Sequence, residues 1–114
     1  MNHILLTLIV LHGFFHAFGF LKAFQLVQFR QLTHTISRSQ GILWLLSGSL
    51  FLCAAILLAL QQPFWWLFLG IAVVVSQSLI LTDWRDAKFG TIANALILAV
   101  TIIGLIGKTL NIIV

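Results

Sequence analysis

Charged residues are scarce in this chain of 114 residues. Lys, Arg, Asp and Glu together make up 7% of it, whereas a soluble domain has about 25%. Glu and Tyr are absent, the acids are limited to Asp83 and Asp86, and Cys53 is the single cysteine. So few charges cannot build a water-facing surface, which excludes a disordered chain and an ordinary cytosolic enzyme. A single cysteine also excludes a disulfide scaffold.

Long apolar runs take the place of the missing charges, and hydrophobic residues make up 61% of the chain. A helix that crosses a bilayer needs about 20 mostly apolar residues, and four runs have this length: 4–24, 42–60, 64–82 and 92–110. Amides in hydrocarbon need internal partners, which helices supply. We therefore predict an all-α fold, a transmembrane four-helix bundle, formed by residues 1–114 as one integral membrane domain. The first run has no basic segment before it and no small-residue cleavage site after it, so we expect it to be retained rather than cleaved as a signal peptide.

The basic residues indicate how the chain is oriented. Five of them lie on one side of the predicted spans: Lys22, Arg30, Arg38, Arg85 and Lys88. The sixth, Lys108, lies nearer the other side. Cytoplasmic loops collect Lys and Arg, so we expect a multi-pass plasma-membrane protein with both termini outside the cytoplasm. The net charge is +4, but these residues are too few and scattered for a phosphate-tracking surface. The expected partner is the lipid bilayer, not a nucleic acid.

His12 and His16 lie close to the middle of the first predicted span. Their i, i+4 spacing places both imidazoles on one helix face, and ionisable groups at this depth are rare and often functional. The pair could ligate a metal, relay protons, or hydrogen-bond a small ligand or a quinone-like or lipidic carbonyl. Zinc needs at least three protein ligands, and no third ligand follows from the spacing. The structural alternatives are a water-lined cavity, or hydrogen bonds to polar groups on other helices: Ser47, Ser49, Gln77 or Asn94.

Gln77 and Asn94 lie near the inner ends of the third and fourth predicted spans. An amide side chain in hydrocarbon is costly without a partner. We therefore predict that both face the interior and bond each other or the first helix. They are weaker candidates for cofactor binding than the histidines, and the sequence does not identify a cofactor.

A polar cluster is predicted at the inner interface, and it consists of Lys22, Asp83, Arg85, Asp86 and Lys88. The i, i+3 spacing of the two acids can hold Mg²⁺ on substrate phosphates. With basic residues beside them, a salt-bridge network in the loop is the other interpretation.

Smaller signals concern helix ends and helix packing. Ser37 is predicted to cap the second helix, and the segment 25–36 has apolar residues at roughly helical spacing, as in an interfacial helix. Small residues four apart favour close helix contacts, within the chain or with a homo-oligomer or membrane partner protein. Such pairs are Gly13 and Ala17, Ser49 and Cys53, and Ala95 and Ala99.

Three stretches resemble a family of small, uncharacterised bacterial four-helix integral membrane proteins. They are His12-Gly13-x-x-His16 followed by Lys22-Ala23-Phe24, the approach to the second span from Ser37 to Trp44, and Asp86-Ala87-Lys88-Phe89-Gly90-Thr91-Ile92-Ala93-Asn94. The resemblance covers nearly the whole chain, and it implies a four-helix architecture in the bacterial inner membrane. A looser similarity to DoxX-type membrane proteins rests on size and hydropathy alone.

Three functional hypotheses follow from the sequence. In the first, the face of His12 and His16 binds a small ligand, a metal or a lipidic cofactor. In the second, the protein is a non-enzymatic scaffold or accessory subunit that packs against a partner. In the third, it is a membrane enzyme that acts on a lipid or quinone through Asp83, Asp86 and Lys88.

Overall fold

The computed structural model describes residues 3–25 and 37–109, without the side chains of residues 86, 108 and 109. These ranges contain five helices and no strand: α1 (His3–Ala23), α2 (Arg38–Ala59), α3 (Trp65–Thr82), α4 (Trp84–Ala87) and α5 (Gly90–Thr109). The four long helices are each long and apolar enough to cross a membrane. At a rise of about 1.5 Å per residue, helices of this length match the hydrocarbon core of a bilayer. The predicted all-α four-helix bundle is confirmed.

The ends of the long helices lie within two residues of the predicted spans, except at the start of α2. Helix α2 begins at Arg38 rather than at residue 42, and the hydroxyl oxygen of Ser37 accepts a hydrogen bond of 3.2 Å from the backbone N–H of Gln40. The predicted cap at Ser37 is therefore confirmed. Helix α4 is a single turn in a connection that was expected to be a loop. The helix predicted over residues 25–36 lies almost entirely outside the described residues.

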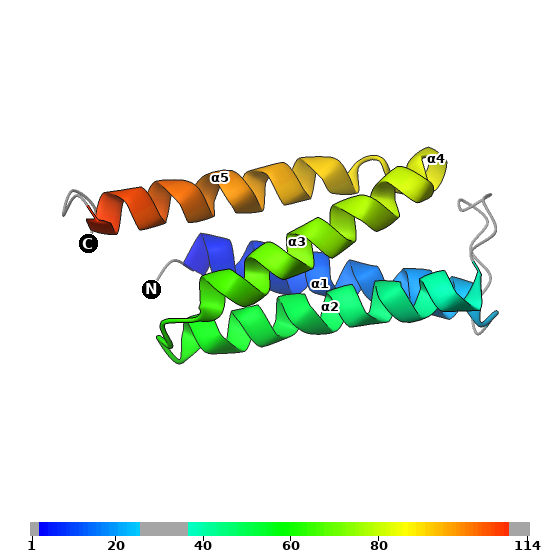
Figure 1. The fold of residues 1–114 in the computed structure, drawn as a ribbon, viewed down its shortest axis with the longest axis horizontal. Coiled ribbons are helices and arrows are strands. Elements are labelled where there is room, and N and C mark those ends of the chain that lie inside the picture. The colour runs from blue at the N-terminus through cyan, green and yellow to red at the C-terminus, as the bar shows by residue number, and fades with distance from the viewer. Residues whose placement is uncertain (1–2, 26–36, 110–114) are drawn as a thin grey trace.

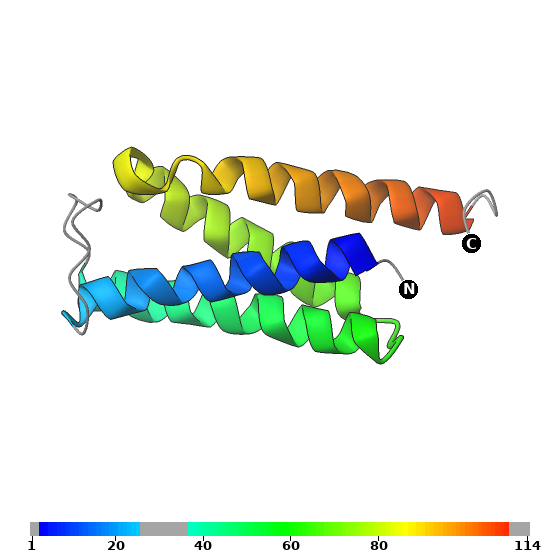
Figure 2. The same cartoon turned by 180° about the vertical axis from the view of Figure 1, so that it is seen from behind.

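The four long helices form a ring in which each contacts its two neighbours, in the order α1, α2, α3, α5. Figure 1 shows α1 and α2 side by side, α3 crossing them obliquely and α5 on the far side. The view from behind shows the same arrangement, with α1 in front of α3 (Figure 2). The α2–α3 turn and the described chain ends at His3 and Thr109 lie at one end of the bundle. Helix α4 and the start of α2 lie at the other.

Helices α1 and α2 share the most extensive interface, and glycines bring their backbones together there. A Cβ atom added to Gly48 would lie 2.8 Å from the carbonyl oxygen of Gly13, a distance that Cβ atoms do not tolerate. Gly13 therefore takes part in a close helix contact, as its small-residue pattern predicts. Two other predicted small-residue pairs face outward instead, because their members are exposed: Ser49 and Cys53, and Ala95 and Ala99.

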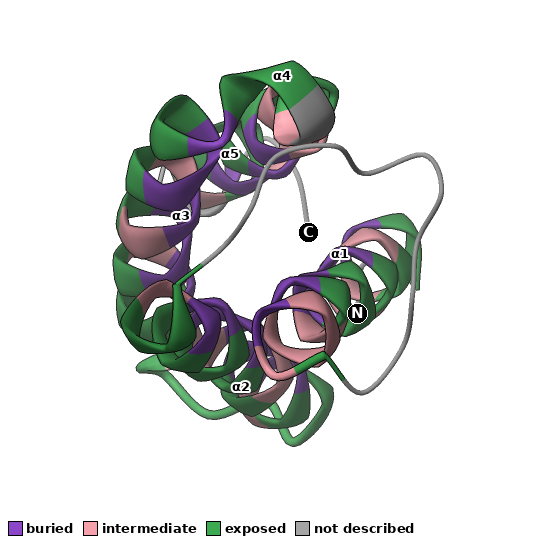
Figure 3. Cartoon of the chain, turned by 90° about the vertical axis from the view of Figure 1, so that its right-hand side faces the viewer, coloured by how far each residue is buried: buried purple, intermediate pink, exposed green. Residues whose placement is uncertain are grey.

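The distribution of polar and apolar side chains is that of a membrane protein. Large apolar residues cover the outside, among them Leu11, Phe14, Ile56, Val74 and Ile103. Figure 3 shows, end on, that the buried positions line the inside of the ring. Exposed apolar area on this scale around the whole circumference is suited to lipid rather than water.

Two apolar clusters fill the interior. The larger lies toward the α2–α3 turn and includes Leu5, Ile9, Phe51 and Leu69, and the smaller lies toward α4 and includes Trp44 and Ile80. Buried polar residues lie between the two clusters: His12, His16, Ser76 and Asn94. The bundle therefore has a polar layer in the middle of an otherwise apolar core.

Candidate functional site: a cavity beside two histidines

His12 and His16 are both buried on the inward face of α1, with 7% and 2% of their surface exposed. Their ring centroids are 4.6 Å apart and the rings are nearly perpendicular, at 89°. The predicted placement on one helix face is confirmed. Phe51 on α2 packs against both rings, at centroid distances of 5.0 and 5.2 Å, which limits their freedom to rotate.

Hydrogen bonds join the two rings to the backbone of α1 and to helices α3 and α5. Nδ1 of His16 lies 2.7 Å from the carbonyl oxygen of His12, one turn earlier in α1, and Nε2 of His16 lies 2.7 Å from the hydroxyl oxygen of Ser76 on α3. Nε2 of His12 lies 2.8 Å from Oδ1 of Asn94 on α5. Buried polar groups in hydrocarbon need such partners, and here the partners also connect three helices.

The network continues through the two amide side chains. Nδ2 of Asn94 donates to the hydroxyl oxygen of Ser76 and to Oε1 of Gln77, at 3.1 Å in both cases. Nε2 of Gln77 donates to the hydroxyl oxygen of Thr91 at 3.0 Å. The predicted contacts of Asn94 with Gln77 and with the first helix are therefore both present.

Ser76 is the partner that the sequence did not single out. The two serines considered for this role lie elsewhere: Ser47 donates to the carbonyl oxygen of Ala72, and Ser49 is exposed and donates within its own helix. Ser76 precedes Gln77 directly, and the Ser-Gln-Ser triplet in an apolar run was the available signal. Which serine of the triplet faces α1 depends on the rotation of α3, which hydropathy does not determine.

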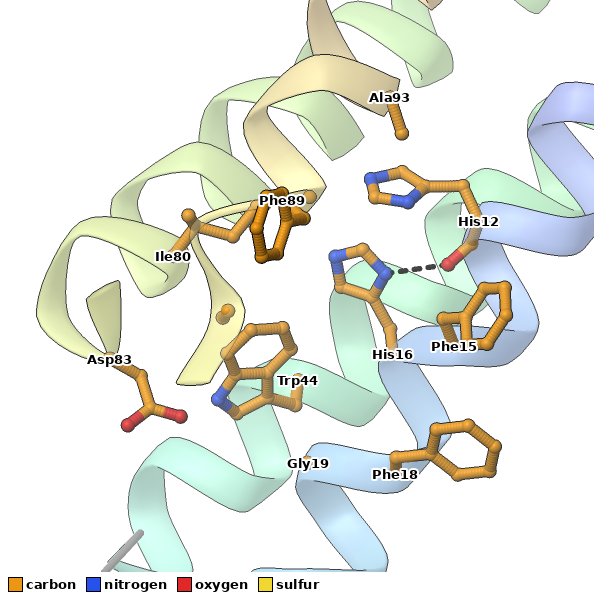
Figure 4. Close-up of a pocket in the computed structure, with 12 residues that line it drawn as sticks. His12, Phe15, His16, Phe18, Gly19, Trp44, Ile80, Asp83, Phe89 and Ala93 are labelled. Carbon is orange, nitrogen blue, oxygen red and sulfur yellow. Dashed lines mark hydrogen bonds between the residues drawn. The ribbon is translucent and has the colours of Figure 1, made fainter. Parts of the chain in front are cut away.

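A cavity of about 370 Å³ borders the two histidines. Figure 4 shows their rings at its wall, with Trp44, Ile80 and Phe89 around it. The lining residues come from all five helices and the turn before α5: His12, Phe15, His16, Phe18, Gly19, Trp44, Ile80, Asp83, Ala87, Phe89, Gly90 and Ala93. Most of this wall is apolar or aromatic, and the imidazoles and one carboxylate are its polar groups.

Glycines shape two parts of the wall. A Cβ atom on Gly19 would overlap the indole of Trp44. The indole can pack against α1 here because glycine has no side chain. A Cβ atom on Gly90 would lie 2.8 Å from Cδ1 of Ile80 and 3.6 Å from Cε1 of His12. The first turn of α5 therefore passes close to both residues, and the cavity lies under this turn.

The rim of the cavity is formed by side chains that are also exposed on the outside of the bundle. Phe15 and Phe18 on α1 are 61% and 42% exposed, and Phe89 before α5 is 73% exposed. Part of the cavity wall is thus also exposed on the outside, between α1 and the start of α5.

The residues of the predicted interface cluster lie at the α4 end of the bundle, but they differ in environment. Asp83 is buried and lines the cavity, and Lys22 is half-buried at the end of α1. Arg85 and Lys88 are exposed. Nζ of Lys88 lies 5.5 Å from the ring centre of Phe89, within the range of a cation–π contact. Asp86 belongs to α4, and its side chain lies outside the described part of the structure.

Most ring nitrogens of the two histidines already take part in hydrogen bonds. Both nitrogens of His16 and one nitrogen of His12 already have hydrogen-bond partners. Among the described residues, no group of three His, Cys, Asp or Glu side chains is placed to hold a metal. A metal on His12 and His16 stays a prediction, and the network would have to break to form it.

Comparisons with protein-family models, curated proteins and solved structures found no match.

Proposed function

We propose that this multi-pass membrane protein binds a small, mostly apolar molecule with one polar group in the cavity beside His12 and His16. The supporting observation is that two buried imidazoles border a cavity whose other walls are mainly apolar, with four aromatic side chains among them. Ligand sites of small molecules commonly combine an apolar wall with a few fixed polar groups, in volumes of about 300–1,000 Å³. The cavity of about 370 Å³ lies in this range.

The fixed position of the imidazoles supports a binding role. Hydrogen bonds on three sides and the ring of Phe51 hold them in place before any ligand arrives. A site whose polar groups are held in advance does not have to order them on binding, which increases affinity. A purely structural role would be served by packing that leaves no open volume beside the rings.

The position of the rim supports the bilayer as the source of the ligand. Phe15 and Phe89 belong both to the cavity wall and to the outer surface, where lipid chains surround the bundle. A molecule dissolved in the bilayer can therefore reach the histidines without passing through water. This favours a lipophilic ligand over a polar metabolite.

Binding in the cavity can be tested with a substitution that fills part of the cavity and leaves both histidines unchanged. Ala93 lines the cavity, and Figure 4 shows its side chain close to the ring of His12. Leu at this position occupies part of the volume, so we expect Ala93→Leu to abolish binding of the probe 1-naphthol. Ala99→Leu is the matched control, because it makes the same change on the exposed face of the same helix.

The measurement is the rise in unfolding temperature of the detergent-solubilised protein with increasing 1-naphthol. A ligand at a concentration 100-fold above its Kd stabilises the folded state by about 2.7 kcal/mol. We expect this rise in the wild type and in Ala99→Leu, and its loss in Ala93→Leu. Equal rises in all three proteins, or none in any, would contradict binding in this cavity.

We also propose that the protein lies in a bacterial inner membrane with both termini outside the cytoplasm. Four basic residues of the described chain support this orientation, because they lie at the α4 end of the bundle: Lys22, Arg38, Arg85 and Lys88. Cytoplasmic ends of membrane proteins are enriched in such residues. The cavity then lies in the half of the bundle nearer the cytoplasm.

A further inference from the structure

The hydrogen-bond network determines which histidine nitrogens carry protons when both rings are neutral. A carbonyl oxygen only accepts, so Nδ1 of His16, which lies 2.7 Å from the carbonyl oxygen of His12, must carry the proton. Nε2 of His16 then has a lone pair. The hydroxyl of Ser76 lies 2.7 Å from this nitrogen and 3.4 Å from Oδ1 of Asn94. We assign its only proton to the shorter contact, because two lone pairs would otherwise face each other there.

The orientation of the Asn94 amide follows from the serine. With its proton given to His16, the Ser76 oxygen can only accept from its neighbour on α5 at 3.1 Å. That neighbour is therefore the NH₂ group of Asn94, and an amide turned the other way would place two acceptors against each other. The remaining N–H of Asn94 goes to Oε1 of Gln77, which agrees with this orientation.

Oδ1 of Asn94 therefore faces His12, and it only accepts. Nε2 of His12, at 2.8 Å, must be the protonated nitrogen. The two histidines are thus opposite tautomers: His16 is protonated on Nδ1 and His12 on Nε2. The second nitrogen of His12, Nδ1, has a lone pair.

This lone pair belongs to a residue that lines the cavity. Among the described residues, no hydrogen bond is formed by Nδ1 of His12. The hydroxyl of Thr101 is the one fully enclosed side-chain polar atom without a partner in the described chain, so Nδ1 of His12 is not fully enclosed. Figure 4 shows this nitrogen on the ring edge nearer His16, where the imidazoles border the cavity.

We propose that the cavity selects ligands that carry a hydroxyl on an aromatic ring, such as a phenol or a hydroquinone, which donates to Nδ1 of His12. This inference rests on the proposed function and narrows it. A molecule that offers only a carbonyl or ether oxygen meets another acceptor at this position. The aromatic body suits the walls, where Trp44, Phe15 and Phe89 offer ring faces and edges.

A pair of probes separates the hydroxyl from the rest of the ligand. The first is 1-naphthol, and the second is 1-methoxynaphthalene, which has the same ring system without the O–H. A net gain of one hydrogen bond corresponds to about a fivefold difference in Kd. We expect 1-naphthol to bind wild-type protein about fivefold more tightly in detergent micelles, and His12→Phe to remove the difference.

The outcomes distinguish this inference from the proposed function. If both probes bind with equal Kd and Ala93→Leu weakens both, the cavity binds ligands but the donor selectivity is wrong. If neither probe binds, both the proposed ligand binding and the proposed preference for a hydroxyl donor are wrong. Ser49→Ala is the control for substitution in the bundle, since its hydroxyl is exposed on α2 and bonds only within its helix.

The tautomers can also be measured without a substitution. Solid-state nitrogen NMR of the protein in bilayers, with ¹⁵N-labelled histidine, separates protonated from unprotonated ring nitrogens. We expect His12 protonated on Nε2, His16 protonated on Nδ1, and a shift of the His12 Nδ1 signal when 1-naphthol is added. Protonation of His12 on Nδ1 would overturn the inference, even if His12→Phe does not fold.

Discussion

Ser76→Ala tests the polar layer most sharply, because one small change removes two hydrogen bonds. The hydroxyl of Ser76 serves Nε2 of His16 at 2.7 Å and Nδ2 of Asn94 at 3.1 Å. Ser76 is fully buried, so neither water nor a lipid headgroup takes the place of its hydroxyl when the side chain is removed. Alanine leaves an imidazole nitrogen and an amide N–H without these partners.

The magnitude follows from the two groups left unpaired. A buried polar group without a partner costs about 1–3 kcal/mol in soluble proteins, and side-chain hydrogen bonds between membrane helices contribute about 0.6 kcal/mol on average, with a maximum of about 1.7. For two bonds in one layer we expect a loss of about 2 kcal/mol in the free energy of unfolding. Ser78→Ala is the matched control, since Ser78 is exposed and bonds only to the carbonyl oxygen of Val74 in its own helix. We expect a change below about 0.5 kcal/mol there.

The assay is reversible unfolding in mixed micelles of a mild detergent and sodium dodecyl sulfate, followed by circular dichroism. The expected result is a lower midpoint for Ser76→Ala and an unchanged midpoint for Ser78→Ala. If the two variants unfold at the same detergent fraction, the polar layer does not hold the helices together.

Three further predictions concern the packing of α1 against α2, the hydroxyl of Thr101 and the orientation of the chain in the membrane. Gly48→Ala places a Cβ atom 2.8 Å from the backbone of Gly13, so we expect a loss of about 1–3 kcal/mol by overpacking in the same unfolding assay. Gly70→Ala, with no atom within 4 Å of the new Cβ, should be neutral or stabilising by up to about 1 kcal/mol, and equal losses in both would contradict the close helix approach. The Thr101 hydroxyl is enclosed without a partner among the described residues, so Thr101→Val should raise the unfolding midpoint by an amount worth about 1 kcal/mol, and a lower midpoint would count against this. In a Cys53→Ser background, a membrane-impermeant maleimide added to intact spheroplasts should label Gln62→Cys and reach Arg85→Cys only after permeabilisation. The reverse pattern would invert the orientation, and labelling of both from one side would contradict a membrane-spanning α3.

Hydropathy and spacing were sufficient for the architecture and for part of the site. The four long helices follow from apolar runs, because a chain with so few charges has no other way to satisfy its amides in lipid. The shared face of His12 and His16 follows from helical geometry, and the contact between Gln77 and Asn94 follows from the cost of an isolated amide. Helix α4 was not predicted, because a single helical turn is too short to produce a periodic pattern of apolar residues.

The cavity was beyond the reach of sequence reasoning. Its wall combines residues from helices whose order around the ring and whose rotation are set by close packing, such as Gly19 against Trp44. Phe89 and Ile80 are two of many apolar residues, and hydropathy does not distinguish those beside a cavity from those in lipid. Asp83 was assigned to an interface cluster, and only the fold shows that it lines the same space as the histidines.

A bound ligand in the space beside His12 and His16 would be visible directly. The most direct measurement is a high-resolution density map of the protein in lipid nanodiscs with 1-naphthol. We expect ring-shaped density between Trp44 and Phe89, with the naphthol oxygen at hydrogen-bond distance from Nδ1 of His12. A map in which Phe15, Phe18 and Phe89 fold inward and fill the space against the histidines would contradict it.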